Sequence, residues 1–116
     1  MLIVDDNDDI REALSLLLEA RGYPTVCADN GATALALLRN DRIDPCLILL
    51  DLSMPVMDGA TFRREQQHDP GLSRLPVVLY SGVADPAREA ATLDVPHYFM
   101  KPLNLDKLVG VVASYC

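Results

Sequence analysis

The sequence lacks a cluster of basic residues. Lys and Arg together number 10 against 17 Asp and Glu, which gives a formal net charge of −7. Because nucleic acid is recognised electrostatically by basic patches, the chain is not expected to contact nucleic acid directly. A protein or a cation is the expected partner.

The sequence also lacks the apolar run of about 18 residues that a membrane span requires. No charged segment precedes a short apolar one, as it would in a signal peptide. Cys27, Cys46 and Cys116 are odd in number and do not have the spacing of a metal site. We therefore expect a cytoplasmic protein with reduced thiols and no membrane association.

No internal repeat or linker divides the 116 residues. This length suits one domain with a single core, so we expect one domain over residues 1–116. The chain starts directly with strand-like residues and stops abruptly at Cys116. Such ends are expected of a piece cut from a longer multidomain protein.

Short apolar runs alternate with segments of helical periodicity along the whole chain. The expected strands lie at 1–4, 25–28, 45–50, 75–80 and 97–100, and the expected helices at about 8–21, 30–39, 59–67, 84–93 and from 105. Right-handed crossovers then produce an α/β fold, a doubly wound five-stranded parallel sheet with five helices.

The third expected strand organises the chain. Its apolar residues do not alternate with polar ones, which is typical of a strand buried on both faces, and it ends at Asp51. Asp58-Gly59 marks an irregular loop behind it. In open α/β sheets ligands bind at the carboxyl ends of the strands, so Asp51 is a candidate functional residue.

Other polar residues follow neighbouring strands at the same expected edge: Asp5 and Asp6, Ser81, and Lys101, one of only two lysines. Carboxylates that crowd together repel unless a cation relieves them, and Mg²⁺ prefers such oxygen ligands. A carboxylate is also a nucleophile toward phosphorus. The edge therefore predicts Mg²⁺-dependent phosphoryl chemistry.

At these positions the sequence resembles the receiver domain of two-component response regulators, the CheY-like proteins. The resemblance spans nearly the whole chain and depends on four motifs in order: Val4-Asp5-Asp6-Asn7, Leu50-Asp51 with Met54-Pro55 and Asp58-Gly59 behind it, Val78-Leu79-Tyr80-Ser81-Gly82, and Tyr98-Phe99-Met100-Lys101-Pro102.

The resemblance implies a flavodoxin-like strand order 2-1-3-4-5. It also implies a role for each site residue: Asp51 as phosphoacceptor, Asp5, Asp6, Asp51 and the Ser53 carbonyl as Mg²⁺ ligands, Lys101 as the phosphate-pairing lysine, Ser81 as the switch hydroxyl and Tyr98 as the aromatic that turns inward on activation.

The resemblance further implies that Asp51 receives its phosphoryl group from the phosphohistidine of a sensor histidine kinase or a phosphotransfer protein. The domain would then dephosphorylate itself, and would not be a conventional turnover enzyme. Phosphorylation would alter the surface of the fourth helix, fifth strand and fifth helix, which would contact an output domain or a second copy of the chain.

Two other functions stay open. One is a degenerate receiver that binds partners without phosphorylation, against which the intact set of acids, hydroxyl and lysine counts. The other is a phosphohydrolase using Asp51, against which Ser53 counts, since it stands where the familiar aspartate phosphatases have a second acid. The sequence also departs from the usual receiver pattern at 94–96, where Asp-Val-Pro precedes the fifth expected strand.

Overall fold

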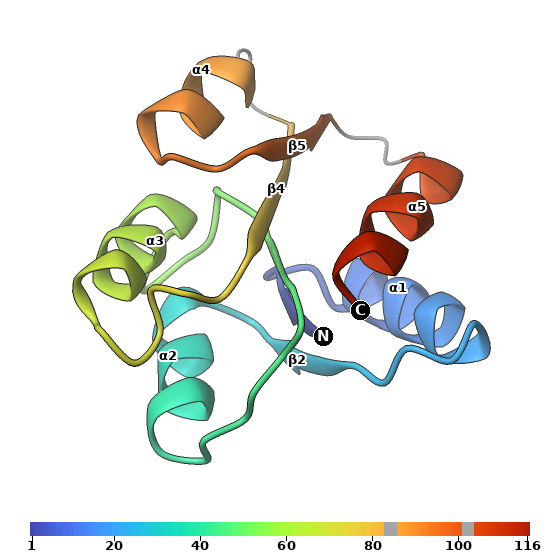
Figure 1. The fold of residues 1–116 in the computed structure, drawn as a ribbon, viewed down its shortest axis with the longest axis horizontal. Helices are drawn as coiled ribbons and strands as arrows, with labels where there is room; N and C mark the ends of the chain where they lie inside the picture. The colour runs from blue at the N-terminus through green and yellow to red at the C-terminus, as the bar shows by residue number, and fades with distance from the viewer. Residues whose placement is uncertain (83–85, 101–103) are drawn as a thin grey trace.

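A parallel sheet of five strands forms the centre of the molecule, in the order β2-β1-β3-β4-β5 (Figure 1). The computed structural model describes residues 1–82, 86–100 and 104–116. The strand order changes direction between β1 and β3, which are neighbours. Both the predicted doubly wound fold and the order 2-1-3-4-5 are confirmed.

The elements alternate strictly along the chain. The strands are β1 (Leu2–Val4), β2 (Val26–Ala28), β3 (Ile48–Leu50), β4 (Val77–Ser81) and β5 (His97–Met100). The helices are α1 (Asp8–Ala20), α2 (Gly31–Arg39), α3 (Gly59–His68), α4 (Pro86–Thr92) and α5 (Leu105–Tyr115).

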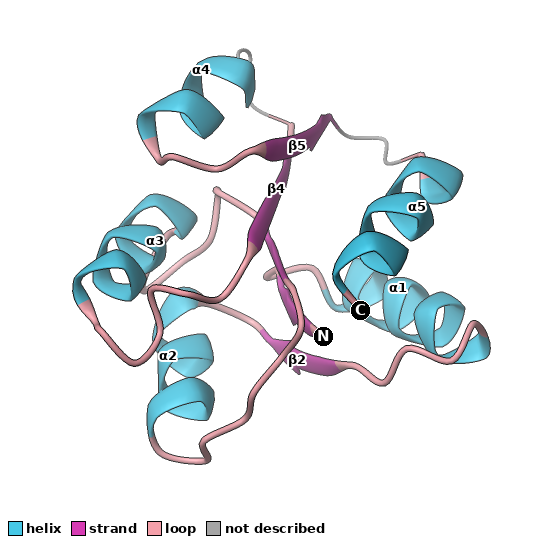
Figure 2. Ribbon diagram, in the orientation of Figure 1, coloured by secondary structure: helices cyan, strands magenta, loops and turns pink. Residues whose placement is uncertain are grey.

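Helices cover both faces of the sheet (Figure 2). On one face, Leu2 and Val4 pack in a cluster with residues of α2, α3 and α4, such as Phe62. On the other face, Ile3 packs with Leu18 and other residues of α1 and α5. The alternation along β1 follows from the period of two in a strand. The central strands are therefore buried on both faces, as their continuous apolar runs predict.

Among the described residues, polar N-cap side chains begin the helices α1, α2, α3 and α5. The side chains of Asn7, Asn30, Asp58 and Asn104 each accept a hydrogen bond from the backbone N–H three residues later. Such caps satisfy N–H groups that have no partner within the helix. Asn7 and Asn30 come within three residues of the ends of β1 and β2, so these two caps lie close to the carboxyl edge of the sheet.

The unusual segment at 94–96 is held by the guanidinium of Arg63 in α3. Its Nε donates to the carbonyl oxygen of Leu93 at 3.0 Å and its Nη2 to that of Asp94 at 2.8 Å. Asp94 has a positive φ of 56°, so its carbonyl is directed away from the regular helical path. The turn between α4 and β5 is thus bonded to the neighbouring helix α3.

The prediction of reduced thiols is wrong for two of the three cysteines. Cys46 and Cys116 form a disulfide with a Cα–Cα distance of 5.4 Å, whereas Cys27 is free and exposed. Cys46 lies just before β3, and Cys116 follows the last turn of α5, which packs on the same face of the sheet. The two residues are 70 positions apart, so only the packing of α5 against the sheet brings them together.

In the part of the chain that the structure describes, no helix is long and apolar enough to cross a membrane.

Candidate functional site

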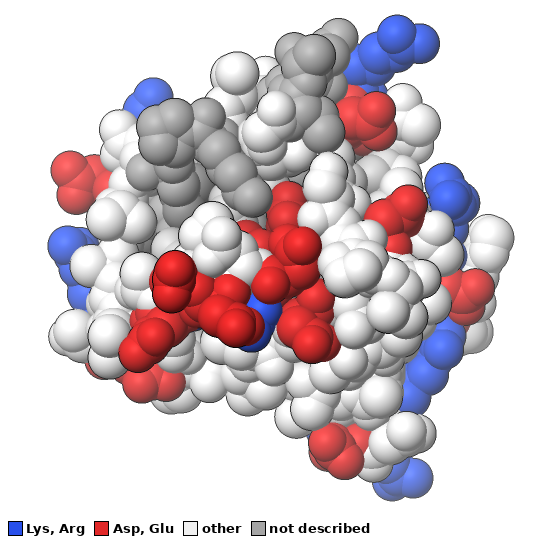
Figure 3. Space-filling view, turned by 180° about the vertical axis from the view of Figure 1, so that it is seen from behind, with Lys and Arg blue, Asp and Glu red and all other residues white. Residues whose placement is uncertain are grey.

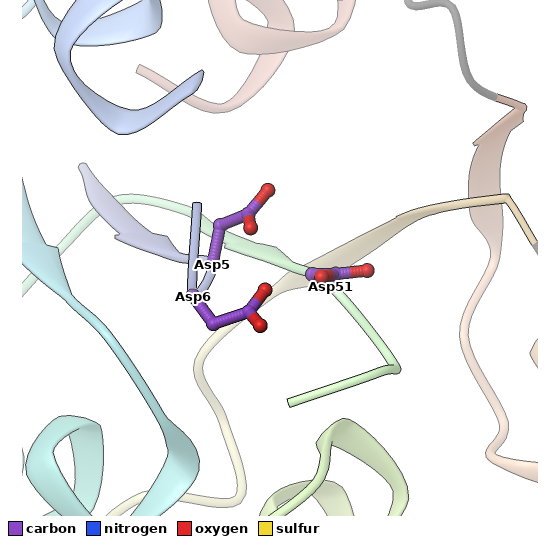
Figure 4. A group of neighbouring side chains, drawn as sticks. All are labelled: Asp5, Asp6 and Asp51. Carbon is purple, nitrogen blue, oxygen red and sulfur yellow. The ribbon is translucent and has the colours of Figure 1, made fainter. Parts of the chain in front are cut away.

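Three carboxylates meet at the carboxyl edge of the sheet (Figure 4). Asp5 and Asp6 follow β1, and Asp51 follows β3, the adjacent strand. Potential ligand oxygens of the three side chains all lie within 4.8 Å of one another. Asp5 and Asp51 are buried, with 0% and 2% of their surface exposed, while Asp6 is exposed. The structure therefore brings together the three acids that the sequence singled out.

The charge of this cluster favours a bound cation. Two carboxylates at such a separation repel by about 3 kcal/mol at an effective dielectric near 20. Acidic side chains also gather in the middle of the face shown in Figure 3. The cluster offers only oxygen ligands, and one member is open to solvent. This donor set fits Mg²⁺, which binds oxygen and keeps part of its water shell.

Hydrogen bonds hold Asp5 at both carboxylate oxygens. Its Oδ1 accepts from the backbone N–H of Asn7 at 2.9 Å. Its Oδ2 accepts from the phenol of Tyr80, which is buried in β4. The backbone carbonyl of Asp5 accepts from the Arg11 guanidinium at 2.6 Å. These donors compensate for the burial of a charged group, which is unfavourable without hydrogen bonds.

Gly59 allows the loop behind Asp51 to return against the end of β3. Its N–H donates to the carbonyl of Leu52 at 2.9 Å. A Cβ at this position would lie 2.4 Å from the Asp51 carbonyl oxygen and 2.8 Å from the Leu52 Cα. Only glycine fits there without a shift of the backbone that carries Asp51. The sequence had indicated a turn at Asp58-Gly59 but not this contact.

Asp58 starts α3 at the end of that loop. Its Oδ1 accepts from the backbone N–H of Thr61 at 2.8 Å. Hydrogen bonds from Thr61 hold the pKa of the Asp58 carboxyl below its usual value. The ionised cap therefore fixes the start of the helix and, with it, the return of the loop to Asp51.

The remaining predicted site residues differ in their placement. Ser81 is the last residue of β4 and is 1% exposed. Tyr98 lies in β5 and is 45% exposed. Ser53 is exposed in the loop after β3. Lys101 lies outside the described residues. The structure thus places Ser81 at the same edge of the sheet as the acids, two strands from β1.

Tyr80 is the residue at this edge to which the sequence alone assigned no role. It brings a hydroxyl into β4 directly after three apolar residues, and a buried tyrosine hydroxyl usually has a hydrogen-bond partner. That signal indicates a polar contact but not its identity. The partner, Asp5, is 75 positions away in the sequence.

The family model of the response regulator receiver domain matches residues 1–113. Among characterised proteins, the chain is 39% identical over 114 residues to the regulatory protein AtoC of Escherichia coli (strain K12), covering 97% of this chain and 24% of AtoC. It is 32% identical over 115 residues to the sporulation initiation phosphotransferase F of Bacillus subtilis (strain 168), covering 99% and 91%. The chain thus spans about a quarter of one relative and nearly all of the other.

Solved structures show the same fold. A response regulator receiver protein from Pseudomonas putida superposes with a TM-score of 0.88 at 31% identity, over 97% of this chain and 93% of that one. The response regulator TrrA of Thermotoga maritima, crystallised in complex with Mg²⁺-BeF, has a TM-score of 0.84 at 26% identity, over 99% and 96%.

Receiver domains of response regulators interact with histidine kinases or phosphotransfer proteins and have an acidic pocket that binds Mg²⁺. The match to the family model, the relatives and the strand order agree with one another. This chain belongs to the response regulator receiver domain family of two-component signalling.

Proposed function

We propose that this chain is a phosphoacceptor receiver domain that catalyses Mg²⁺-dependent phosphoryl transfer to its own Asp51. The observation that carries the proposal is the meeting of Asp5, Asp6 and Asp51, whose ligand oxygens lie within 4.8 Å of one another at the carboxyl edge of the sheet. A turn or a helix cap requires one acid; it does not require three acids from two adjacent strands.

Asp5, Asp6, Asp51 and the Ser53 backbone carbonyl would hold the Mg²⁺ ion. When bound, the ion supplies positive charge against the acids and against the incoming phosphoryl oxygens. The hydrogen bonds from Asn7 and Tyr80 to Asp5 support this assignment, because they orient a carboxylate that the fold has already buried.

In the proposed reaction, a carboxylate oxygen of Asp51 attacks the phosphorus atom of a phosphohistidine on a sensor histidine kinase or phosphotransfer protein. An oxygen–phosphorus bond forms and the nitrogen–phosphorus bond breaks. The leaving imidazole keeps the electron pair and takes up a proton. Lys101 would pair with a phosphoryl oxygen and the Ser81 hydroxyl would donate to another.

Hydrolysis of the aspartyl phosphate by water would then return Asp51 to its free form. The chain would thus modify and restore itself without turning over a separate substrate as a conventional enzyme does.

The proposed output surface is formed by α4, β5 and α5. Phosphorylation adds roughly 1.5 to 2 negative charges, and Ser81 would move toward them while Tyr98 turns inward. The exposure of Tyr98 supports this role, since the side chain starts from an outward position. Met100 and Leu105 are exposed apolar residues nearby in sequence, at 58% and 42%. They suit contact with an output domain or a second copy of the chain.

We further propose that residues 1–116 form a single receiver domain of a longer cytoplasmic protein. The relative AtoC supports this, because the chain matches only 24% of its length. A free-standing receiver is the alternative, and the relative from Bacillus subtilis, matched over 91% of its length, represents it.

Intact mass spectrometry tests the proposed function. The protein is incubated with Mg²⁺ and acetyl phosphate beside Asp51→Asn, and beside Asp9→Asn as a matched control in the first turn of α1. The wild type and Asp9→Asn should each gain one phosphoryl group, and the gain should be absent in Asp51→Asn and absent without Mg²⁺. A folded wild type that gains nothing would refute the proposal and favour a receiver that binds partners without phosphorylation.

A further inference from the structure

We propose that Tyr80 is a positioning residue for the Mg²⁺ site, through its hydrogen bond to Asp5. This inference rests on the proposed function of that site. The Tyr80 hydroxyl donates to Oδ2 of Asp5, and both residues are buried, with 1% and 0% of their surface exposed. The bond joins β4 to the end of β1, although β3 lies between these two strands.

The register of the sheet explains how the phenol reaches Asp5. Val4 pairs with Leu50, and Leu50 pairs with Leu79. Asp5, Asp51 and Tyr80 each follow one of these residues, so they occupy one row across β1, β3 and β4. Because side chains alternate along a strand, Tyr80 points to the α1–α5 face, where it packs in the same cluster as Ile3 and Leu49.

Asp5 and Tyr80 lie on either side of the phosphoacceptor in this row. Two strand spacings amount to about 9 to 10 Å. A side chain as long as that of tyrosine is needed to cover that distance, and the Tyr80 hydroxyl reaches past β3 to Asp5. No shorter hydroxyl side chain at this position could make the bond.

The bond restricts the Asp5 carboxylate while leaving it able to bind a cation. Oδ1 accepts from the Asn7 N–H and Oδ2 from Tyr80, so the side chain is fixed at both ends. Each carboxylate oxygen has two lone-pair directions, and each of these two hydrogen bonds uses one of them. Hydrogen bonds of this kind orient ligating carboxylates, and their removal commonly lowers metal affinity by about 10- to 100-fold.

A tyrosine that merely fills the core would behave differently. Its hydroxyl would contribute to stability, but its loss would leave Mg²⁺ affinity unchanged once the protein had folded. Positioning predicts a change in affinity itself. Mg²⁺ affinity of the folded protein therefore separates the two roles.

The test compares Tyr80→Phe with wild type and with Tyr23→Phe, a matched control in which the same hydroxyl is removed from a residue outside the site. Mg²⁺ binding is measured by isothermal titration calorimetry, and folding by circular dichroism. Tyr80→Phe should bind Mg²⁺ about tenfold more weakly, while Tyr23→Phe should match wild type. In Tyr80→Phe, the Mg²⁺ concentration that gives half-maximal incorporation of the phosphoryl group from acetyl phosphate should rise by a similar factor. The rate of phosphoryl incorporation at saturating Mg²⁺ should change less.

Equal Mg²⁺ affinity in Tyr80→Phe and wild type would overturn the positioning role and leave the proposed function intact. A wild type that binds no Mg²⁺ and gains no phosphoryl group would overturn both. Should Tyr80→Phe fail to fold, nuclear magnetic resonance of the wild type decides the question. Mg²⁺ should shift the ring signals of Tyr80 more than those of Tyr23, and an equal or smaller shift would overturn the inference.

Discussion

Replacement of Arg63 by methionine tests how α3 holds the turn before β5. Arg63 is 8% exposed, and its guanidinium donates to the carbonyls of Leu93 and Asp94 and, at 2.8 Å, to Oε1 of Gln66. Methionine keeps most of the apolar stem and removes all three donors. The cavity left behind is therefore small, and the change reports mainly on hydrogen bonding.

The expected loss of stability follows from these three bonds. Hydrogen bonds to charged groups contribute about 1.5 to 3 kcal/mol each. The Leu93 carbonyl keeps a second donor, the Gln67 amide at 3.2 Å. Removing a buried guanidinium also removes its desolvation cost, which already lowers the pKa of Arg63. With these offsets, we expect Arg63→Met to lower the free energy of unfolding by about 3 kcal/mol and the melting temperature by roughly 10 °C.

Urea unfolding followed by far-ultraviolet circular dichroism measures this loss. Arg64→Met is the matched control, because Arg64 is exposed and its hydrogen bond to the Thr61 hydroxyl is long, at 3.4 Å. That control should change stability by less than about 0.5 kcal/mol. Arg63→Lys should recover only part of the loss, since an ammonium does not reproduce the planar fork. A loss in Arg63→Met no larger than that in Arg64→Met would refute the reasoning.

Three further predictions concern the site and the disulfide. Gly59→Ala should destabilise the protein by about 1 to 3 kcal/mol and slow the incorporation of a phosphoryl group at Asp51, because the alanine Cβ would displace the backbone of Asp51 and Leu52. An unchanged rate of phosphoryl incorporation with an unchanged melting temperature would contradict this. Cys116→Ser should lower stability by about 2 to 4 kcal/mol under oxidising conditions, as expected for a bond between residues 70 positions apart. Cys27→Ser is its control, and equal melting of the two variants would exclude a stabilising disulfide. Asp58→Ala should cost about 1 kcal/mol at neutral pH. The pKa of Asp58 in the folded protein is below its ordinary value of 3.8. The stability difference between wild type and Asp58→Ala should therefore be complete above pH 3.8 and should disappear as the pH falls through the lower folded pKa. A difference in melting temperature between the two proteins that persists at still lower pH would contradict this.

Local patterns in the sequence determine the elements and most of the edge that carries the site. Continuous apolar runs predict buried parallel strands, and helical periodicity predicts helices at about 8–21, 30–39 and from 105, which α1, α2 and α5 confirm. Right-handed crossovers then leave few arrangements of five strands. Because the carboxyl ends of parallel strands meet at one edge, the sequence alone predicts that Asp5 and Asp51 lie together.

Tertiary structure alone decides which side chains contact one another across the sheet. The bond from Tyr80 to Asp5 spans 75 positions, and the disulfide of Cys46 spans 70. Neither pair has a local signal, because each depends on the register of three strands or on the packing of α5. Arg63 is similar, since an arginine in a polar helix pattern gives no sign of burial. Sequence periodicity determines which face of an element is buried, whereas packing determines which polar groups become partners there.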